Sequence, residues 1–132
     1  MDYIAIRNNE TVDLDKIPVH EYDTFRSLIL SWIRDHDSFH CVNYFGIPEE
    51  SGIRPVCLLA DDATGTIRVL SYRLKHPYVP VTSMSNEYPG FNVFERELHE
   101  NQGVFFTDHP WLKPLRYPFN RVDQGQVIDN YP

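Results

Sequence analysis

Ionisable side chains are concentrated in one short stretch, residues 95–100, with the sequence Glu-Arg-Glu-Leu-His-Glu. Carboxylate and imidazole groups of this kind can act as general acids and bases or bind a divalent metal ion. Glu95 and Glu97 stand two residues apart, and side chains at that spacing on a helix do not face one another. They cannot share a proton as a catalytic carboxylate pair would, and we predict no catalytic residue in this chain.

A metal site is the next chemistry to consider. Glu95 and His99 are four residues apart, which is the spacing of half a metal site or of an acid–base couple on a helix. Further ligands would have to come from His109, His76 or His40. These histidines are scattered, and the predicted helix lacks a His-x-x-x-His pair. We predict no metal in this chain; a small metal-binding enzyme that uses Glu95, His99 and His109 stays as an alternative.

The same carboxylates also have a structural interpretation. Arg96 and Glu100 are four residues apart and can pair along the solvent side of a helix, for about 0.3–0.5 kcal/mol. Glu95 lies beside the apolar stripe of the same helix, so a buried Glu95 needs a cationic or hydrogen-bonding partner. Lys113 and Arg116 are the candidates, because the chain must turn back after the helix.

Two amphipathic helices are predicted from apolar residues at helical spacing. The first covers about residues 20–36, where Phe25 and Ile29 fall on the same side. The second begins near Tyr88 and ends at Gly103, because a glycine just past the last helical residue favours a left-handed C-terminal cap. These helices must position the ionisable side chains described above.

Segments rich in β-branched, aromatic and aliphatic residues predict the strands, at residues 39–46, 55–60, 66–74 and 78–84. The turn residues 61–65 join the second and third segments into a hairpin. Pro77 and Pro80 favour an edge position for the last one. The predicted fold class is α+β: a small, mostly antiparallel sheet with a hairpin, packed by two amphipathic helices and followed by an extended, proline-rich C-terminal tail.

Composition excludes several classes of function. The 132 residues suit one domain, and 19 acidic against 12 basic residues give a net charge of −7, so nucleic acid is not a predicted partner. No apolar run approaches the ~20 residues that span a bilayer, and the N-terminus lacks the features of a signal peptide. Cys41 and Cys57 form no Cys-x-x-Cys motif and are predicted as free, buried thiols of a cytoplasmic chain.

The second predicted helix and the segment after it resemble a known family. The order of their residues, which follow a Tyr-Pro pair, is similar to the signature of the NuoC-like family of complex I, the 30 kDa subunit of respiratory-chain NADH dehydrogenase. The residues that carry this resemblance are Glu95, Arg96, Glu97, Glu100, Gly103, His109, Pro110 and Lys113.

Other residues depart from the pattern of the complex I branch. That pattern has two apolar residues before the glycine, where this chain has Asn101-Gln102, and it ends on an apolar position where this chain has Arg116. The run His-Pro-Trp-Leu-Lys-Pro at residues 109–114 is more similar to the N-terminal domain of the large subunit of formate-hydrogenlyase-type, membrane-bound nickel-iron hydrogenases. In that branch the domain precedes the catalytic body of the large subunit.

The resemblance implies a non-catalytic assembly domain of a hydrogenase or NADH:quinone oxidoreductase-like complex. Such a domain, here residues 1–116, docks onto a catalytic nickel-iron or quinone-site (NuoD-like) module and neighbouring subunits. Residues 117–132 would then be an extended tail or a linker toward a following domain. The resemblance implies no cofactor in this chain and nickel-iron or iron–sulfur centres in its partners. It also implies a cytoplasmic location, peripheral to the inner face of the cell membrane through the complex.

The partner interface is predicted at Trp111, Leu112 and Arg116, because Trp and Arg are frequent binding anchors and prolines stiffen the segment. The alternative for Trp111 is that it seals the core of its own domain. Two other functions remain open beside the metal enzyme. The chain could be a free-standing NuoC-like subunit of complex I, or an adaptor that binds a peptide on the strand edge at residues 78–84.

Overall fold

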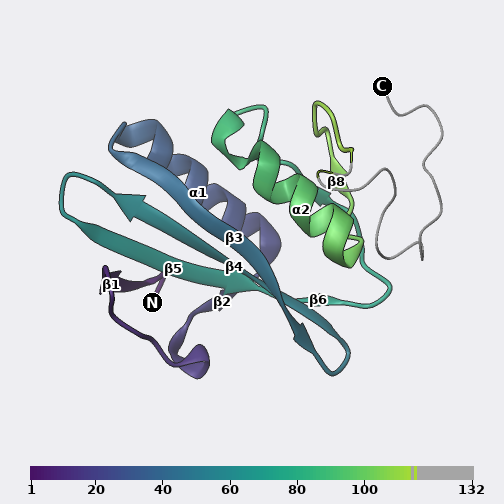
Figure 1. The fold of residues 1–132 in the computed structure, drawn as a ribbon, viewed down its shortest axis with the longest axis horizontal. Helices are drawn as coiled ribbons and strands as arrows, with labels where there is room; N and C mark the ends of the chain where they lie inside the picture. Colours follow the sequence, from purple (N-terminus) through teal and green to yellow (C-terminus); the bar gives the residue numbers. More distant parts are fainter. Residues whose placement is uncertain (114, 116–132) are drawn as a thin grey trace.

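The computed structural model describes residues 1–113 and 115, and it confirms the α+β fold (Figure 1). Within these residues the main sheet has six strands in the order β1-β5-β4-β3, with β2 beside β5 and β6 beside β4. Their bounds are β1 (Ile4–Arg7), β2 (Val19–His20), β3 (Phe39–Glu49), β4 (Gly52–Asp61), β5 (Thr66–Tyr72) and β6 (Leu74–Lys75). All pairings in this sheet are antiparallel except β2 with β5.

The remaining elements lie on one side of this sheet or at its edge. Helix α1 (Tyr22–Asp35) and helix α2 (Asn92–Gln102) contribute to one core, and a parallel pair joins β7 (Val81–Thr82) to β8 (Phe106–Thr107). Short 3₁₀ turns occur at Leu14–Lys16 and Pro89–Phe91. Figure 1 shows β8 next to α2, so the chain returns along the helix after it ends.

The predicted hairpin is confirmed as β4 and β5. Gly65 has φ of +70°, and its N–H donates to the Asp61 carbonyl at 2.9 Å. The Asp61 side chain accepts hydrogen bonds from Ser38 Oγ and from the N–H of Ala63. The aspartate and the glycine that predicted the turn are therefore the residues that close it.

The main core lies between the sheet and both helices. Phe25 and Ile29 of α1 and Leu98 of α2 pack on the inner face of β3, β4 and β5. The ring of Phe25 lies 4.7 Å from that of Tyr72, edge to face, and Tyr72 shares a 2.5 Å hydrogen bond with Tyr44. These contacts hold α1 on the sheet by apolar and aromatic packing.

The opposite face of the sheet carries a smaller cluster around Ile17, Val56 and Val69. Arg54, buried in β4, donates hydrogen bonds to the carbonyls of Leu14 and Ile17. The N-terminal segment is therefore fixed to this face by backbone contacts as well as by apolar packing.

Several boundaries differ from those predicted. Short strands carry too little pattern to be recognised, and the sequence did not predict β1, β2 or β8. Of residues 78–84 only Val81–Thr82 form a strand, and it pairs with β8, so the predicted peptide-binding edge is partly occupied. The second helix begins at Asn92, because Pro89–Phe91 form a 3₁₀ turn. The predicted tail at residues 117–132 lies outside the described residues.

Candidate partner interface

Glu95 is the centre of the site, because its carboxylate is completely buried in the first turn of α2. It accepts hydrogen bonds from Ser83 Oγ at 2.6 Å, from the N–H of Met84 at 2.9 Å, and from Ser85 Oγ. Burial raises the pKa of Glu95 above its ordinary value, and these hydrogen bonds act in the opposite direction. Helix α2 is thereby attached to the segment that follows β7.

The predicted partners of Glu95 were only partly right. A hydrogen-bonding partner was expected and is present, but the donors come from Ser83, Met84 and Ser85 rather than from Lys113. Arg116, the other candidate, lies outside the described residues. The sequence did contain a signal for these donors: Ser83 and Ser85, on either side of Met84, lie twelve and ten positions before Glu95.

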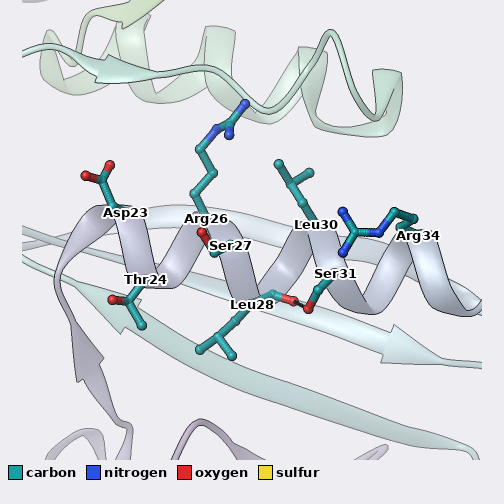
Figure 2. Close-up of a pocket in the computed structure, with 8 residues that line it drawn as sticks. All are labelled: Asp23, Thr24, Arg26, Ser27, Leu28, Leu30, Ser31 and Arg34. Atoms are coloured by element: carbon teal, nitrogen blue, oxygen red, sulfur yellow. Dashed lines mark hydrogen bonds between the residues drawn. The ribbon is translucent and has the colours of Figure 1, made fainter.

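Helix α1 holds the same serine segment from its other side. Arg26 donates through Nε and Nη2 to the Ser83 carbonyl, at 3.3 and 3.1 Å, and forms an ion pair with Glu87 at 2.7 Å. Tyr22 donates its hydroxyl hydrogen to the Thr82 carbonyl. Figure 2 shows the Arg26 side chain extending from α1 toward neighbouring segments of the same chain. Arg26 and Leu30 both line a surface hollow along the helix. Segment 82–87 is thus fixed between the helices.

His109 brings the chain after α2 back to Glu95. Its side chain is completely buried, with Nε2 at 3.7 Å from Glu95 Oε1 and 3.4 Å from the Asn92 carbonyl. Burial lowers the pKa of His109; the Asn92 carbonyl raises it, and the charge of Arg96 lowers it further. A neutral imidazole therefore faces the carboxylate at neutral pH.

Trp111 lies on the surface next to this buried group. Its side chain is 45% exposed, so it does not belong to the core of the domain. The guanidinium carbon of Arg96 is 4.6 Å from the Trp111 ring centre, and Arg96 Nε donates to the Lys113 carbonyl at 3.0 Å. Leu112, which was predicted as interface, packs partly against the main core. The predicted interface residue Arg116 lies outside the described residues.

Glu100 corrects the predicted polarity of α2. It was expected on the solvent side, but it is only 1% exposed, and its Oε2 accepts a hydrogen bond from the N–H of Leu115. That prediction was wrong because the chain following α2 returns over the side of the helix that a helical wheel assigns to solvent. Both Glu95 and Glu100 therefore attach chain segments to α2.

The other signature residues have structural positions along the helix and its exit. Gly103 ends α2 with φ of +77°, and its N–H donates to the His99 carbonyl at 2.9 Å, as its predicted cap requires. Pro110 is exposed between His109 and Trp111, and Glu97 lines a small hollow beside β3. Gln102, one of the departures from the family pattern, donates to the Gly46 carbonyl of β3 at 2.9 Å. The polar side chain at this position thus provides a hydrogen bond to a backbone carbonyl of β3.

The alternative metal site can be compared with these positions. Glu95 and His109 do lie together, but the Nδ1 atom of His99 is hydrogen-bonded to the Val104 carbonyl at 2.8 Å. Among residues 1–113 and 115, no three His, Cys, Asp or Glu side chains are grouped as metal ligands would be. Cys57 is buried and Cys41 is half-buried, both as free thiols. The contacts of Glu95 and His109 join chain segments to the first turn of α2.

The contacts described above define a class of protein, an α+β domain in which buried glutamates attach surface segments to a helix. The family model described as the respiratory-chain NADH dehydrogenase 30 kDa subunit matches residues 20–123. The chain therefore belongs to this NuoC-like family.

Three relatives give the range of similarity. The chain is 29% identical over 84 residues to the C subunit of F420H2 dehydrogenase from Methanosarcina mazei, covering 64% of this chain and 53% of that protein. It is 47% identical over 36 residues to the C subunit of NADH-quinone oxidoreductase from Xanthobacter autotrophicus, and 44% over 36 residues to the protein of the same name from Sinorhizobium medicae. Each of these matches covers 27% of this chain, and they cover 17% and 18% of the relatives. The chain thus spans about half of the first relative.

Within the part of the chain that the structure describes, neither helix has the length and apolar character needed to cross a bilayer.

Proposed function

We propose that this chain is a non-catalytic assembly unit of a complex I-type oxidoreductase, and that it docks onto the catalytic, NuoD-like module through residues 109–113 and Arg96. Family membership supports the host, because the relatives are named as subunits of NADH-quinone oxidoreductase and F420H2 dehydrogenase. The redox centres, nickel-iron or iron–sulfur, would belong to partner modules. The complex would hold the chain at the inner face of the membrane.

One observation supports the docking surface above all others. Trp111 is an exposed aromatic side chain whose backbone is attached to a buried carboxylate cluster through His109. A large side chain that is already held in one place loses little conformational entropy when a partner covers it. Trp111 is exposed and contacts the half-buried Arg96, and Trp and Arg are also the residue types enriched among binding anchors.

A hydrogenase is the second candidate host. The run of residues 109–114, His-Pro-Trp-Leu-Lys-Pro, favours it, since this run is more similar to the hydrogenase branch than to the complex I branch. The two hosts differ in the catalytic module, which carries paired Cys-x-x-Cys motifs for nickel and iron in a hydrogenase. The full reading frame and the genes beside it distinguish these candidates.

The docking proposal is tested by the affinity of the chain for the catalytic module encoded with it. Trp111→Ala should weaken binding by roughly 30-fold, which corresponds to a hot-spot loss of about 2 kcal/mol. The free energy of unfolding of the isolated chain should fall by less than about 1 kcal/mol, because its Arg96 contact lies at the surface. Titration calorimetry and urea denaturation measure the two quantities.

Leu14→Ala is the matched control. Leu14 is a 51% exposed apolar side chain in the N-terminal 3₁₀ turn, which Figure 1 shows on the other side of the sheet from α2. It should leave the affinity unchanged. Equal affinities of the parent and Trp111→Ala would refute the docking surface, and a Trp111→Ala chain that unfolds by itself would assign Trp111 to stability.

A further inference from the structure

The hydrogen bonds around His109 determine which of its ring nitrogens carries the proton. The N–H of Trp111 donates to His109 Nδ1 at 3.0 Å, so Nδ1 must present a lone pair. The proton of the neutral ring is then on Nε2, which lies 3.4 Å from the Asn92 carbonyl and 3.7 Å from Glu95 Oε1. Both sides of the ring are satisfied by the neutral Nε2–H tautomer.

The bond between Trp111 and His109 closes a turn that sets the course of the exposed segment. Pro110 has no N–H, so the amide of Trp111 is the first backbone donor after His109. Asn86 Nδ2 donates to the Asp108 carbonyl at 2.6 Å, and Asp108 has φ of +63°. The backbone that carries the Trp111 ring is thus held just before His109 by Asn86 and just after it by the imidazole.

We propose that His109 is the positioning residue of the Trp111 surface, and that protonation of its ring releases the Trp111 turn. A protonated imidazole carries N–H groups at both nitrogens. Its Nδ1–H would then face the N–H of Trp111, and that hydrogen bond is lost. The Nε2–H side is unaffected, and the positive ring is attracted to Glu95. The role of this surface as a docking site rests on the proposed function, whereas the turn and its release do not.

The charged and titratable groups around His109 fix the direction of the pH dependence. Glu95, Arg96 and His99 face it from α2. From α1, Arg26 and Tyr22 act on Glu95 rather than on His109. Burial, Arg96 and His99 place the pKa of His109 below its usual 6.5. The neutral form, with its turn, is therefore complete above pH 6.5 and is lost as the pH falls through the lowered pKa.

The test uses the whole chain without a partner. Hydrogen exchange of the Trp111 amide is followed by NMR from about pH 7.5 to about pH 5, with rates corrected for the intrinsic effect of pH. In the unsubstituted chain, which is the parent of the variants below, protection of this amide should fall about tenfold as His109 is protonated, since one hydrogen bond is lost. The emission of Trp111 in a Trp32→Phe background, where Trp111 is the remaining tryptophan, should change over the same range.

His109→Asn is the matched variant, because an Asn side-chain oxygen accepts the N–H two residues on in the same kind of turn and does not titrate in this range. Its Trp111 amide should stay protected at every pH, whereas His109→Ala should be unprotected throughout. Because His109→Asn retains Glu95, a flat profile there assigns the transition to the imidazole.

A Trp111 amide that stays protected while the ring resonances of His109 show its protonation, or the same transition in the unsubstituted chain and in His109→Asn, would overturn the inference and leave the docking measurements untouched. If the profile is as expected but Trp111→Ala does not weaken binding, the proposed function fails and the role of His109 in the turn stands.

Discussion

Helices α1 and α2 pack on the same face of the sheet, but the side chains that they bury differ in chemistry. The buried residues of α1 are Phe25 and Ile29, and they contact rings and aliphatic side chains. The buried residues of α2 are Leu98 and the carboxylates Glu95 and Glu100. A helix with acidic groups on its buried sides has to find donors for them, because a buried charge without partners costs several kcal/mol.

This difference explains why the segments next to α2, rather than those next to α1, form the candidate interface. Apolar packing is not directional, so the buried side chains of α1 place no set requirement on their neighbours. The directional contacts of α1, from Arg26 and Tyr22, go to the same segment 82–87 that Glu95 binds. A carboxylate requires N–H or O–H groups at set positions. Glu95 therefore fixes the backbone at Met84, and Glu100 fixes it at Leu115. The exposed Trp111 lies on a segment whose course these bonds define.

The largest effect expected from the loss of a polar contact is that of Glu95→Ala. It leaves the hydroxyls of Ser83 and Ser85 and the N–H of Met84 without their acceptor, so the free energy of unfolding should fall by about 3–5 kcal/mol. Glu95→Gln keeps one acceptor oxygen and should cost about 1–3 kcal/mol. Urea denaturation monitored by circular dichroism measures both.

The control for Glu95 is Glu50→Ala, in the exposed turn between β3 and β4, which should change the free energy of unfolding by less than about 0.5 kcal/mol. Equal and small effects at both positions would show that the Glu95 carboxylate is hydrated in solution, and the contrast between the helices would disappear.

A smaller effect is expected for Phe25→Leu in α1. The substitution keeps an apolar side chain in a fully buried position but loses ring contacts with Tyr72 and Tyr44, for a cost of about 1.5 kcal/mol. Thermal denaturation compares it with Phe25→Ala, which should cost about 3–5 kcal/mol because it also leaves a cavity. A Phe25→Leu chain as unstable as Phe25→Ala would mean that α1, too, depends on specific geometry.

The contrast between the helices also marks what the sequence could predict. Helix α1, the β4–β5 hairpin and the left-handed cap at Gly103 depend on periodicity and turn residues that lie within a few positions of one another. The family signature in α2 was likewise visible, and family membership was confirmed. Local patterns of this kind suffice for the fold class.

The contacts of the carboxylates could not be predicted in the same way. Glu95 was placed beside the apolar stripe correctly, yet its donors come from Ser83, in the segment predicted as an edge strand at residues 78–84, and from Ser85 just after it. Glu100 was placed in solvent because a helical wheel contains no information on where the chain goes after Gly103. Such contacts depend on tertiary structure, which one amphipathic pattern does not specify.

The smallest predicted effect concerns Arg68 of β5, which adds a cation to the aromatic packing of α1. Its guanidinium carbon lies 4.3 Å from the ring centre of Tyr3, 4.7 Å from that of Trp32 and 4.8 Å from that of Phe39. Arg68→Met keeps the apolar stem and removes the charge, so the free energy of unfolding should fall by about 1 kcal/mol. Urea denaturation measures this change.

Arg34→Met is the control for the loss of charge at Arg68. Its guanidinium is exposed and lies 3.8 Å from Asp35, a surface ion pair that contributes little, so its effect should stay below about 0.5 kcal/mol. If Arg68→Met cost no more than Arg34→Met, the rings alone would hold this end of α1. A loss of several kcal/mol would instead show that the aromatic packing of α1 on the sheet, and not only its Arg26 contact, depends on a charged group, and the comparison between the helices would fail on that side.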